Sequence, residues 1–383
     1  MISGFVHPDF GGVTKALRSI ASHKHGGGAA VAVLHEGELV VDAWVGARDA
    51  RGTPWCSDTI VMSFSTTKGV IATTAHRLVD RGLLDYDEPV ATYWPEFAAA
   101  GKERVTVRQL LSHSAGLHQL RGVIDDASEM LDWDLVCSRL AAEAPRYEPG
   151  TRHGYHGITF GFLVGEVIRR VTRTTVNEAV DAEIAKPLGL DGVSIGVAPG
   201  DRGRVAELIM RFGDAERAEP FARRASRFAS LKPAIDTFMV PGSDRLFASS
   251  DILDAAVPAV NGFFTARSLA RMYAALAGGG VLEGSRFLSA DTLRRATEVQ
   301  STGLDLVVGF PMRWRLGYHL AATTRGVLPN GFGHFGFGGS GAWADPDRNL
   351  AVAFVCNRVA GTPFGDTRLL RVGAQAQSAA AAR

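Results

Sequence analysis

Ser65 and Lys68 stand three residues apart in the stretch Met62-Ser-Phe-Ser-Thr-Thr-Lys-Gly-Val70. If a helix begins here, the two side chains lie on one face of it, about one turn apart. A serine hydroxyl is a weak nucleophile at neutral pH and needs an adjacent base or cation, which this lysine could supply. On its own, the pair fits a helix start with a solvated lysine better, because two common residues often fall at this spacing by chance.

A second candidate is Tyr155, in the glycine-rich stretch Pro149-Gly-Thr-Arg-His-Gly-Tyr-His-Gly157. A tyrosine in such a loop, just before the apolar run that starts at Ile158, can expose its phenol to a cleft. Near cations the pKa of a phenol falls, so that it can serve as a general base and then as an acid. The alternative is a tyrosine that only packs.

The third candidate is the stretch Gly333-His-Phe-Gly-Phe-Gly-Gly-Ser-Gly341. Glycines weaken a strand, and they often mark a place where a ligand or another backbone approaches closely. A substrate carbonyl lying against this strand could accept a backbone N–H, with the N–H of Ser65 as the other half of an oxyanion hole. The alternative is a β-bulge or a bend.

Together, and in this order, the three stretches resemble the motifs of penicillin-recognising serine hydrolases. Those motifs are Ser-x-x-Lys, Tyr-x-Asn and Lys-Thr-Gly, the last often His-x-Gly. The resemblance is closest to the class C β-lactamase-like branch, which includes the family VIII carboxylesterases, and it runs from about residue 10 to about residue 360. Connecting segments resemble the family as well: Leu110-Leu-Ser-His-Ser-Ala-Gly116, Tyr147-Glu-Pro-Gly150, Pro187-Leu-Gly-Leu190 and Trp343-Ala-Asp-Pro346.

The resemblance implies a role for each matching residue. Ser65 would attack a carbonyl and form an acyl-enzyme, with Lys68 and Tyr155 as general base and acid. These two groups are expected to titrate as a coupled pair, so either could be called the base. The oxyanion and substrate-binding group would consist of Ser65, His334, Gly336 and Phe337.

Two departures from the family pattern bear on the substrate. Gly157 stands where β-lactamases and D,D-peptidases carry the asparagine that holds the substrate amide. His334-Phe-Gly336 replaces Lys-Thr-Gly, whose lysine and threonine help to bind a carboxylate; histidine is mostly neutral at pH 7, and phenylalanine cannot donate. We therefore expect a serine carboxylesterase that cleaves small, short-acyl esters. The alternatives are a β-lactamase or D,D-peptidase-like enzyme, and a non-catalytic binding protein on the same fold.

Ser340 is a competing nucleophile, because Gly338-Gly-Ser-Gly-Ala342 nearly fits the Gly-x-Ser-x-Gly elbow. That elbow needs a helix after the serine, whereas a further strand is expected here. His76 falls within the apolar helix that follows Ser65 and is expected to be structural. The histidines and the three cysteines show no metal-ligand spacing, so no metal or other cofactor is expected.

The elements that must position these residues follow from their patterns. A β-hairpin is expected at 29–44, and an apolar helix from Ser65 to a stop at Gly82. Later strands are expected at 333–344 and 350–356, and 306–320 looks extended. Further helices are expected at 133–143, 158–171, 175–187, 265–276 and 289–299, and from Thr367 up to a frayed tail at 378–383.

The β-rich ends enclose an α-rich middle, which predicts an α+β fold, an α/β/α sandwich. Its antiparallel sheet would be flanked by helices and carry an inserted all-α domain. The predicted domains are 1–85 with 256–383 for the sheet, and 86–255 for the insertion, in which 200–250 forms an irregular cap. The site would lie between the two domains.

Composition limits the partners. The 383 residues carry 41 Lys+Arg against 40 Asp+Glu, a net charge of +1, which does not favour nucleic acid or an anionic membrane. There is no long uninterrupted apolar run, and the first residues lack a basic and then apolar leader. We therefore expect a cytoplasmic protein whose partner is a small-molecule ester.

Overall fold

A single antiparallel sheet dominates the computed structural model, which describes residues 2–21, 27–210, 230–359 and 366–383. Nine of the described strands form it, in the order β1-β3-β2-β15-β14-β13-β12-β11-β10. They come only from the two ends of the chain: β1 (Ile2–Val6), β2 (Gly28–His35), β3 (Glu38–Gly46), β10 (Ser301–Leu304), β11 (Pro311–Trp314), β12 (His319–Thr323), β13 (Gly326–Phe335), β14 (Gly341–Asp345) and β15 (Leu350–Cys356).

Helices cover both faces of this sheet because its strands are apolar on both sides. In β2, Val31 and Val33 pack toward α1 (Gly11–Ala21) and α15 (Arg368–Ala382). Ala30 and Ala32 point the other way, into the core shared with α2 (Thr67–Asp80) and α13 (Ala266–Ala277). Successive side chains of a strand face opposite sides of its sheet, so one continuous apolar strand serves two cores.

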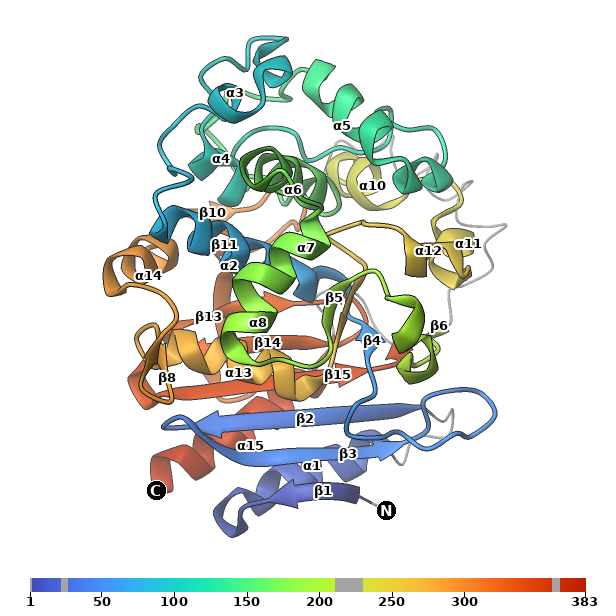
Figure 1. The fold of residues 1–383 in the computed structure, drawn as a ribbon, viewed down its shortest axis with the longest axis vertical. Helices are drawn as coiled ribbons and strands as arrows, with labels where there is room; N and C mark the ends of the chain where they lie inside the picture. The colour runs from blue at the N-terminus through green and yellow to red at the C-terminus, as the bar shows by residue number, and fades with distance from the viewer. Residues whose placement is uncertain (1, 22–26, 211–229, 360–365) are drawn as a thin grey trace.

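A helical layer lies beyond α2, near the β10–β11 edge of the sheet and far from β1 (Figure 1). A small sheet in the order β4-β7-β5 links it to the strands. The remaining bounds are α3 (Val90–Tyr93), α4 (Val107–Leu111), α5 (Trp133–Ala142), α6 (Thr159–Thr172), α7 (Val176–Val180), α8 (Lys186–Leu188), α10 (Lys232–Phe238), α11 (Ser243–Ala248), α12 (Asp251–Asp254), α14 (Ala290–Thr297), β4 (Val61–Met62), β5 (Val193–Ile195), β6 (Ile209–Met210), β7 (Gly262–Phe264), β8 (Val281–Leu282), β9 (Ser285–Arg286) and β16 (Arg358–Val359).

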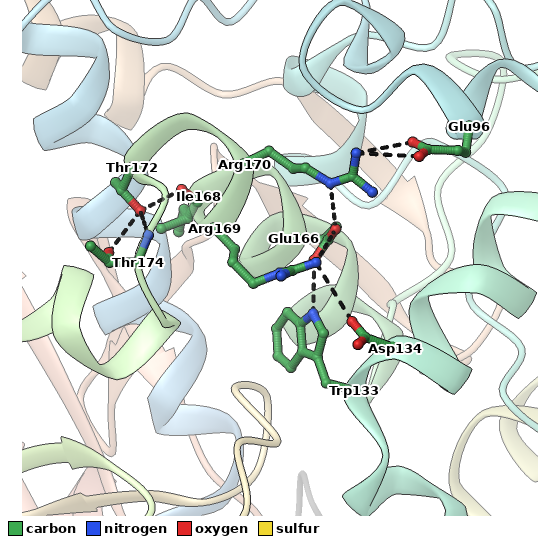
Figure 2. A network of polar contacts seen from close by, with 9 residues as sticks. All are labelled: Glu96, Trp133, Asp134, Glu166, Ile168, Arg169, Arg170, Thr172 and Thr174. Carbon is green, nitrogen blue, oxygen red and sulfur yellow. Dashed lines mark hydrogen bonds and ion pairs between the residues drawn. The ribbon is translucent and has the colours of Figure 1, made fainter.

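Glu166 on α6 is the centre of a polar network that connects segments of the helical layer (Figure 2). Its side chain is 1% exposed, and its carboxylate accepts from Nε of Arg169, Nε of Arg170 and the indole N–H of Trp133, each at 2.7 Å. Arg170 also pairs with Glu96 at 3.0 Å. A buried carboxylate is costly unless it is paired and hydrogen-bonded, and here three donors satisfy it. The network joins α6 to α5 and to the 3₁₀ turn Pro95–Ala98.

The predicted α+β class with an antiparallel sheet flanked by helices is confirmed. The hairpin expected at 29–44 is β2 and β3, and the helix after Ser65 ends at Asp80 with Gly82 at a φ of +68°. The domain boundaries at 85/86 and 255/256 stay a prediction. Of the predicted cap at 200–250, residues 211–229 lie outside the described residues. No described helix has the length and apolarity needed to cross a bilayer.

Three local expectations are wrong. The helix that starts at Thr175 passes through Pro187 and ends at Gly189, because a π-helical turn, Asp181–Ala185, directly precedes the proline and replaces the regular hydrogen-bond pattern that a proline would break. The supposed tail 378–383 is helical up to Ala382, as its alanines favour. The single strand expected at 333–344 is two, since Gly338 and Gly339 turn the chain between β13 and β14.

The extended segment expected at 306–320 is only partly extended. Residues 306–308 form a turn, and β11 and β12 follow as two short antiparallel strands. This turn carries a residue that matters to the site, Asp305, at its start.

Candidate active site

Ser65 is half-buried in the 3₁₀ turn Phe64–Thr66, which leads directly into α2. Phe64 has a φ of +46°, a conformation that costs free energy for any residue other than glycine. The rings of Phe247 and Phe337 pack edge-on against Phe64, with ring centroids 5.8 Å and 5.5 Å away. This packing holds the strained turn in place and sets Ser65 at the start of the buried helix.

The amine of Lys68 lies next to the hydroxyl of Ser65, as the spacing predicts. Nζ is 3.0 Å from Oγ of Ser65 and donates to the carbonyl of Ala259 at 3.1 Å. Lys68 is 0% exposed, and none of the ion pairs within the described part of the chain involves it. Burial lowers the pKa of Lys68 well below its ordinary value. The group therefore favours the neutral amine, which can accept a proton.

Tyr155 completes a triangle with these two residues. The side chain of Ser65 lies close enough to the phenol to lower its pKa, and Nζ of Lys68 lies 4.9 Å from the ring centroid. Burial raises the pKa of Tyr155, the neighbouring side chain of Ser65 lowers it, and the charge of Asp305 raises it. The expected fall in this pKa is wrong, because burial of the phenol is the largest of these effects. The indole of Trp314 stacks on the other side, with centroids 5.3 Å apart and ring planes 6° from parallel.

Asp305 holds the Tyr155 loop, although it is not among the candidates that the sequence motifs indicate. Its carboxylate is fully buried, and Oδ1 accepts from the backbone N–H groups of Tyr155 at 3.1 Å and of Val307 and Val308 at 2.9 Å. Oδ2 accepts from the indole N–H of Trp314 at 2.9 Å. An aspartate that bonds to N–H groups two and three residues onward is a readable turn signal. Its contact with Tyr155 spans 150 positions, and no local pattern predicts it.

Gly336 allows the segment His334-Phe-Gly336 to contact the turn that carries Ser65. A Cβ at this position would lie 2.3 Å from the carbonyl oxygen of Ser63 and 2.8 Å from Oγ1 of Thr66. No side chain fits that space, so only glycine lets the turn after β13 touch the turn that carries Ser65. Gly336 therefore marks a close backbone approach, and its role in binding substrate stays a prediction. Phe337 follows directly and packs on Phe64.

His334 lies against Tyr155, with ring centroids 6.0 Å apart and planes 30° from parallel. Its Nδ1 is 3.0 Å from the carbonyl of Phe335, and its Nε2 has no hydrogen-bond partner among the described residues. Burial lowers the pKa of His334 well below its ordinary value, and the neighbouring His319 and Lys68 lower it further. The imidazole is therefore neutral and offers no charge to a substrate carboxylate.

The competing residues have other roles. Oγ of Ser340 accepts from the N–H of Cys356 at 3.1 Å, and β14, not a helix, follows it, so the elbow reading fails. His76 lies with Nε2 3.0 Å from the carbonyl of Leu316 and Nδ1 2.7 Å from the hydroxyl of Tyr86, which makes it structural as expected. Within the described ranges, no cluster of three or more His, Cys, Asp or Glu residues could hold a metal ion.

A cavity of about 1820 Å³ opens onto this triangle, with Ser65, Tyr155 and His334 among its lining residues. Gly157 also lines the cavity, and the side chain of Phe238 on α10 packs closely against this glycine. A Cβ at position 157 would lie 2.4 Å from Cε1 of Phe238. The ring of Phe238 lies 6.0 Å from that of Tyr155, so an apolar side chain occupies the space beside the motif.

The chain is similar to several known proteins. A family model described as Beta-lactamase matches residues 13–377. The Mycobacterium tuberculosis protein named Esterase/beta-lactamase LipL is 41% identical over 365 residues, covering 94% of this chain and 83% of that protein.

Two solved structures resemble the whole chain. The crystal structure of a family VIII carboxylesterase matches with a TM-score of 0.88 at 37% identity, covering 99% of this chain and 100% of the other. A penicillin-binding protein homologue from Caulobacter crescentus matches with a TM-score of 0.87 at 35% identity, again over 99% and 100%. The resemblance inferred from the three motifs is confirmed. The chain therefore belongs to the β-lactamase family of hydrolases.

Proposed function

We propose that the protein is a serine carboxylesterase that works through an acyl-enzyme at Ser65. The observation that carries the proposal is the contact of 3.0 Å between Nζ of Lys68 and Oγ of Ser65. Because the amine is buried and no described carboxylate pairs with it, its pKa is lowered and it can take the hydroxyl proton. Of the two coupled groups, Lys68 is thus the better resting base, and Tyr155, whose pKa is raised, is the better acid.

Acylation then proceeds with three proton transfers. Oγ of Ser65 attacks the ester carbonyl while its proton passes to the amine of Lys68. The backbone N–H groups of Ser65 and Phe337 would stabilise the oxyanion, a kind of interaction that accounts for a large part of catalysis in acyl transfer. As the C–O bond breaks, the phenol of Tyr155 protonates the departing alkoxide, and the Lys68 ammonium restores that proton. In deacylation, water attacks the acyl carbon and gives a proton to the amine of Lys68. The bond between that carbon and Oγ of Ser65 then breaks, Tyr155 protonates Oγ and regains its proton from the Lys68 ammonium, and the carboxylic acid leaves.

The surroundings of the triangle favour an ester over an amide or a lactam. Phe238 fills the space beside Gly157, where an amide-holding side chain would have to stand. His334 is neutral, so it cannot hold a carboxylate as a lysine would. Both LipL and the family VIII protein are named as esterases. The preference for short acyl groups that the sequence predicts is supported only by the lack of side chains that could hold a substrate amide or carboxylate.

β-Lactam hydrolysis is the second candidate, because the name Esterase/beta-lactamase LipL includes both activities. One experiment separates the two functions: a fluorophosphonate probe followed by peptide mass spectrometry, with p-nitrophenyl butyrate and nitrocefin assayed side by side. We expect the label on Ser65, rapid butyrate turnover and nitrocefin turnover lower by at least about a hundredfold. Equal turnover of the two substrates would favour the lactamase, and the absence of any label would favour a binding protein.

The contacts of Asp305 predict a loss of activity in Asp305→Asn. The asparagine oxygen can still accept from the Tyr155 N–H, but its amide would face the indole N–H of Trp314, donor against donor. Because a small displacement of a catalytic group can lower the reaction rate by up to about a hundredfold, we expect kcat to fall by about 10- to 100-fold. Loss of the charge also lowers the pKa of Tyr155, so the alkaline limb of the kcat profile moves to lower pH.

The exposed Asp291 on α14 provides a matched control. Asp291→Asn should leave both kcat and the pH profile unchanged. A purely structural effect of Asp305→Asn would lower the amount of folded enzyme without moving the alkaline limb, and that outcome would contradict a positioning role.

A further inference from the structure

The cavity above Ser65 is larger and more apolar than a short-acyl ester requires. Its volume of about 1820 Å³ exceeds the roughly 300–1,000 Å³ that a drug-sized ligand occupies. Near the nucleophile its walls are aromatic: Phe64, Phe247 and Phe337 pack as a group on one side. Phe238 and Trp314 flank Tyr155 on the other side.

Apolar side chains also surround the opening of the cavity. Leu231, Phe310 and Val327 line it, and they are 47%, 39% and 60% exposed. They belong to three separate parts of the chain: the residue before α10, the turn before β11, and the start of β13. Large apolar side chains that gather around a concave site mark a surface that binds apolar groups.

The charged residues of the cavity lining are Asp244, Arg245, Arg313 and Asp366, two of each sign, so together they add no net charge that would select a charged substrate. Arg245 pairs with Asp126 at 3.1 Å, and Asp366 pairs with Arg368. These two lining charges therefore already have an opposite charge beside them. Next to Ser65 the cation that could attract an anionic substrate is Lys68, and burial drives this amine toward neutrality.

From the volume, the aromatic walls and the apolar opening, we propose that the natural substrates are esters carrying a large apolar group, of about eight carbons or more. The inference rests on the proposed esterase function and names its substrate class. The apolar group could be the acyl or the alcohol part of the ester, because both parts leave the same carbonyl at Ser65.

The test is a kcat/KM series for p-nitrophenyl esters from acetate to octanoate, beside acetates of alcohols from ethanol to octanol, all below their micellar concentrations. A fully buried methylene contributes a factor of roughly four, so partial burial of six of them predicts at least a tenfold rise along one series. The series that rises shows which part of the ester the cavity takes.

A cavity-filling variant tests where the apolar group binds. Ala234 on α10 lines the cavity, and Ala234→Trp should lower the ratio of octanoyl to acetyl turnover, or of octyl to ethyl, at least tenfold. Ala142→Trp, at an exposed position on α5, is the matched control and should leave the ratio unchanged.

The outcomes separate this inference from the function it rests on. If Ser65-dependent acetate hydrolysis is present but both series are flat or fall with length, the large-substrate inference is wrong and the esterase proposal stands. An unchanged ratio in Ala234→Trp would also overturn the inference. If Ser65→Ala keeps its ester turnover, the proposed function itself fails.

Discussion

Ser65→Ala should abolish the turnover of p-nitrophenyl esters, lowering kcat by at least about a thousandfold. The physical reason is that every step of the proposed reaction passes through Oγ of Ser65, which contacts the amine of Lys68 and lies beside the phenol of Tyr155. Removing the nucleophile lowers kcat by about as much as removing the nucleophile, the base and the acid together, because the base and the acid act only through the nucleophile. The measurement is steady-state hydrolysis with purified protein, checked for folding by thermal denaturation.

Ser340→Ala is the matched control, since it removes a hydroxyl from a buried serine in the neighbouring turn. The hydroxyl of Ser340 accepts from the N–H of Cys356, so its loss should lower stability by about 1 kcal/mol and leave most of the activity. If Ser340→Ala is inactive and Ser65→Ala is active, the nucleophile has been assigned to the wrong residue.

The sequence predicts the parts of this fold and site that depend on local chemistry. Apolar runs at both ends predict the sheet, and the helix after Ser65 follows from its own periodicity. The contact between Ser65 and Lys68 follows from their spacing of three residues at a helix start, so it can be predicted from the sequence alone. Glycines are equally informative where backbones touch: Gly336 has no room for a side chain.

What the sequence does not reveal depends on burial and on long-range contacts. The pKa of Tyr155 was expected to fall, but its direction is set by how deeply the ring is enclosed by Trp314 and His334. Asp305 stands 150 positions from the loop that it holds. Phe238 lies in a region without clear periodicity, and its contact with Gly157 follows only from the position of α10.

These long-range contacts share one physical feature: they enclose the reacting groups in apolar surroundings. Aromatic rings around Ser65 exclude water, and the same exclusion lowers the pKa of Lys68 and raises that of Tyr155. In the proposed reaction, enclosure therefore gives opposite roles to two groups that family resemblance leaves interchangeable. It also makes the cavity apolar, so the proposed substrate preference and the shift of Lys68 toward its neutral form would have the same cause.

Lys68→Met should lower kcat by about 10²- to 10⁴-fold, the usual contribution of a general base. In the wild type, the amine accepts the Ser65 proton only when it is itself unprotonated. Its pKa is lowered well below 10.5, so kcat/KM should rise with pH through that lowered value and then level off. The methionine variant has no such group, and its residual activity should lack this acid limb. Lys68→Arg should be as inactive, because arginine stays charged.

The pH dependence of the free energy of unfolding reports the protonation of Lys68 without relying on catalysis. Because the pKa of Lys68 is lower in the folded protein than in the unfolded chain, the unfolded state binds more protons between the two values. The free energy of unfolding should therefore rise with pH across that window in the wild type, by more than it does in Lys68→Met. Denaturant titrations at several pH values measure the difference between the two proteins. Equal pH dependence would mean that Lys68 stays protonated in the folded protein, and a protonated Lys68 could not be the resting base.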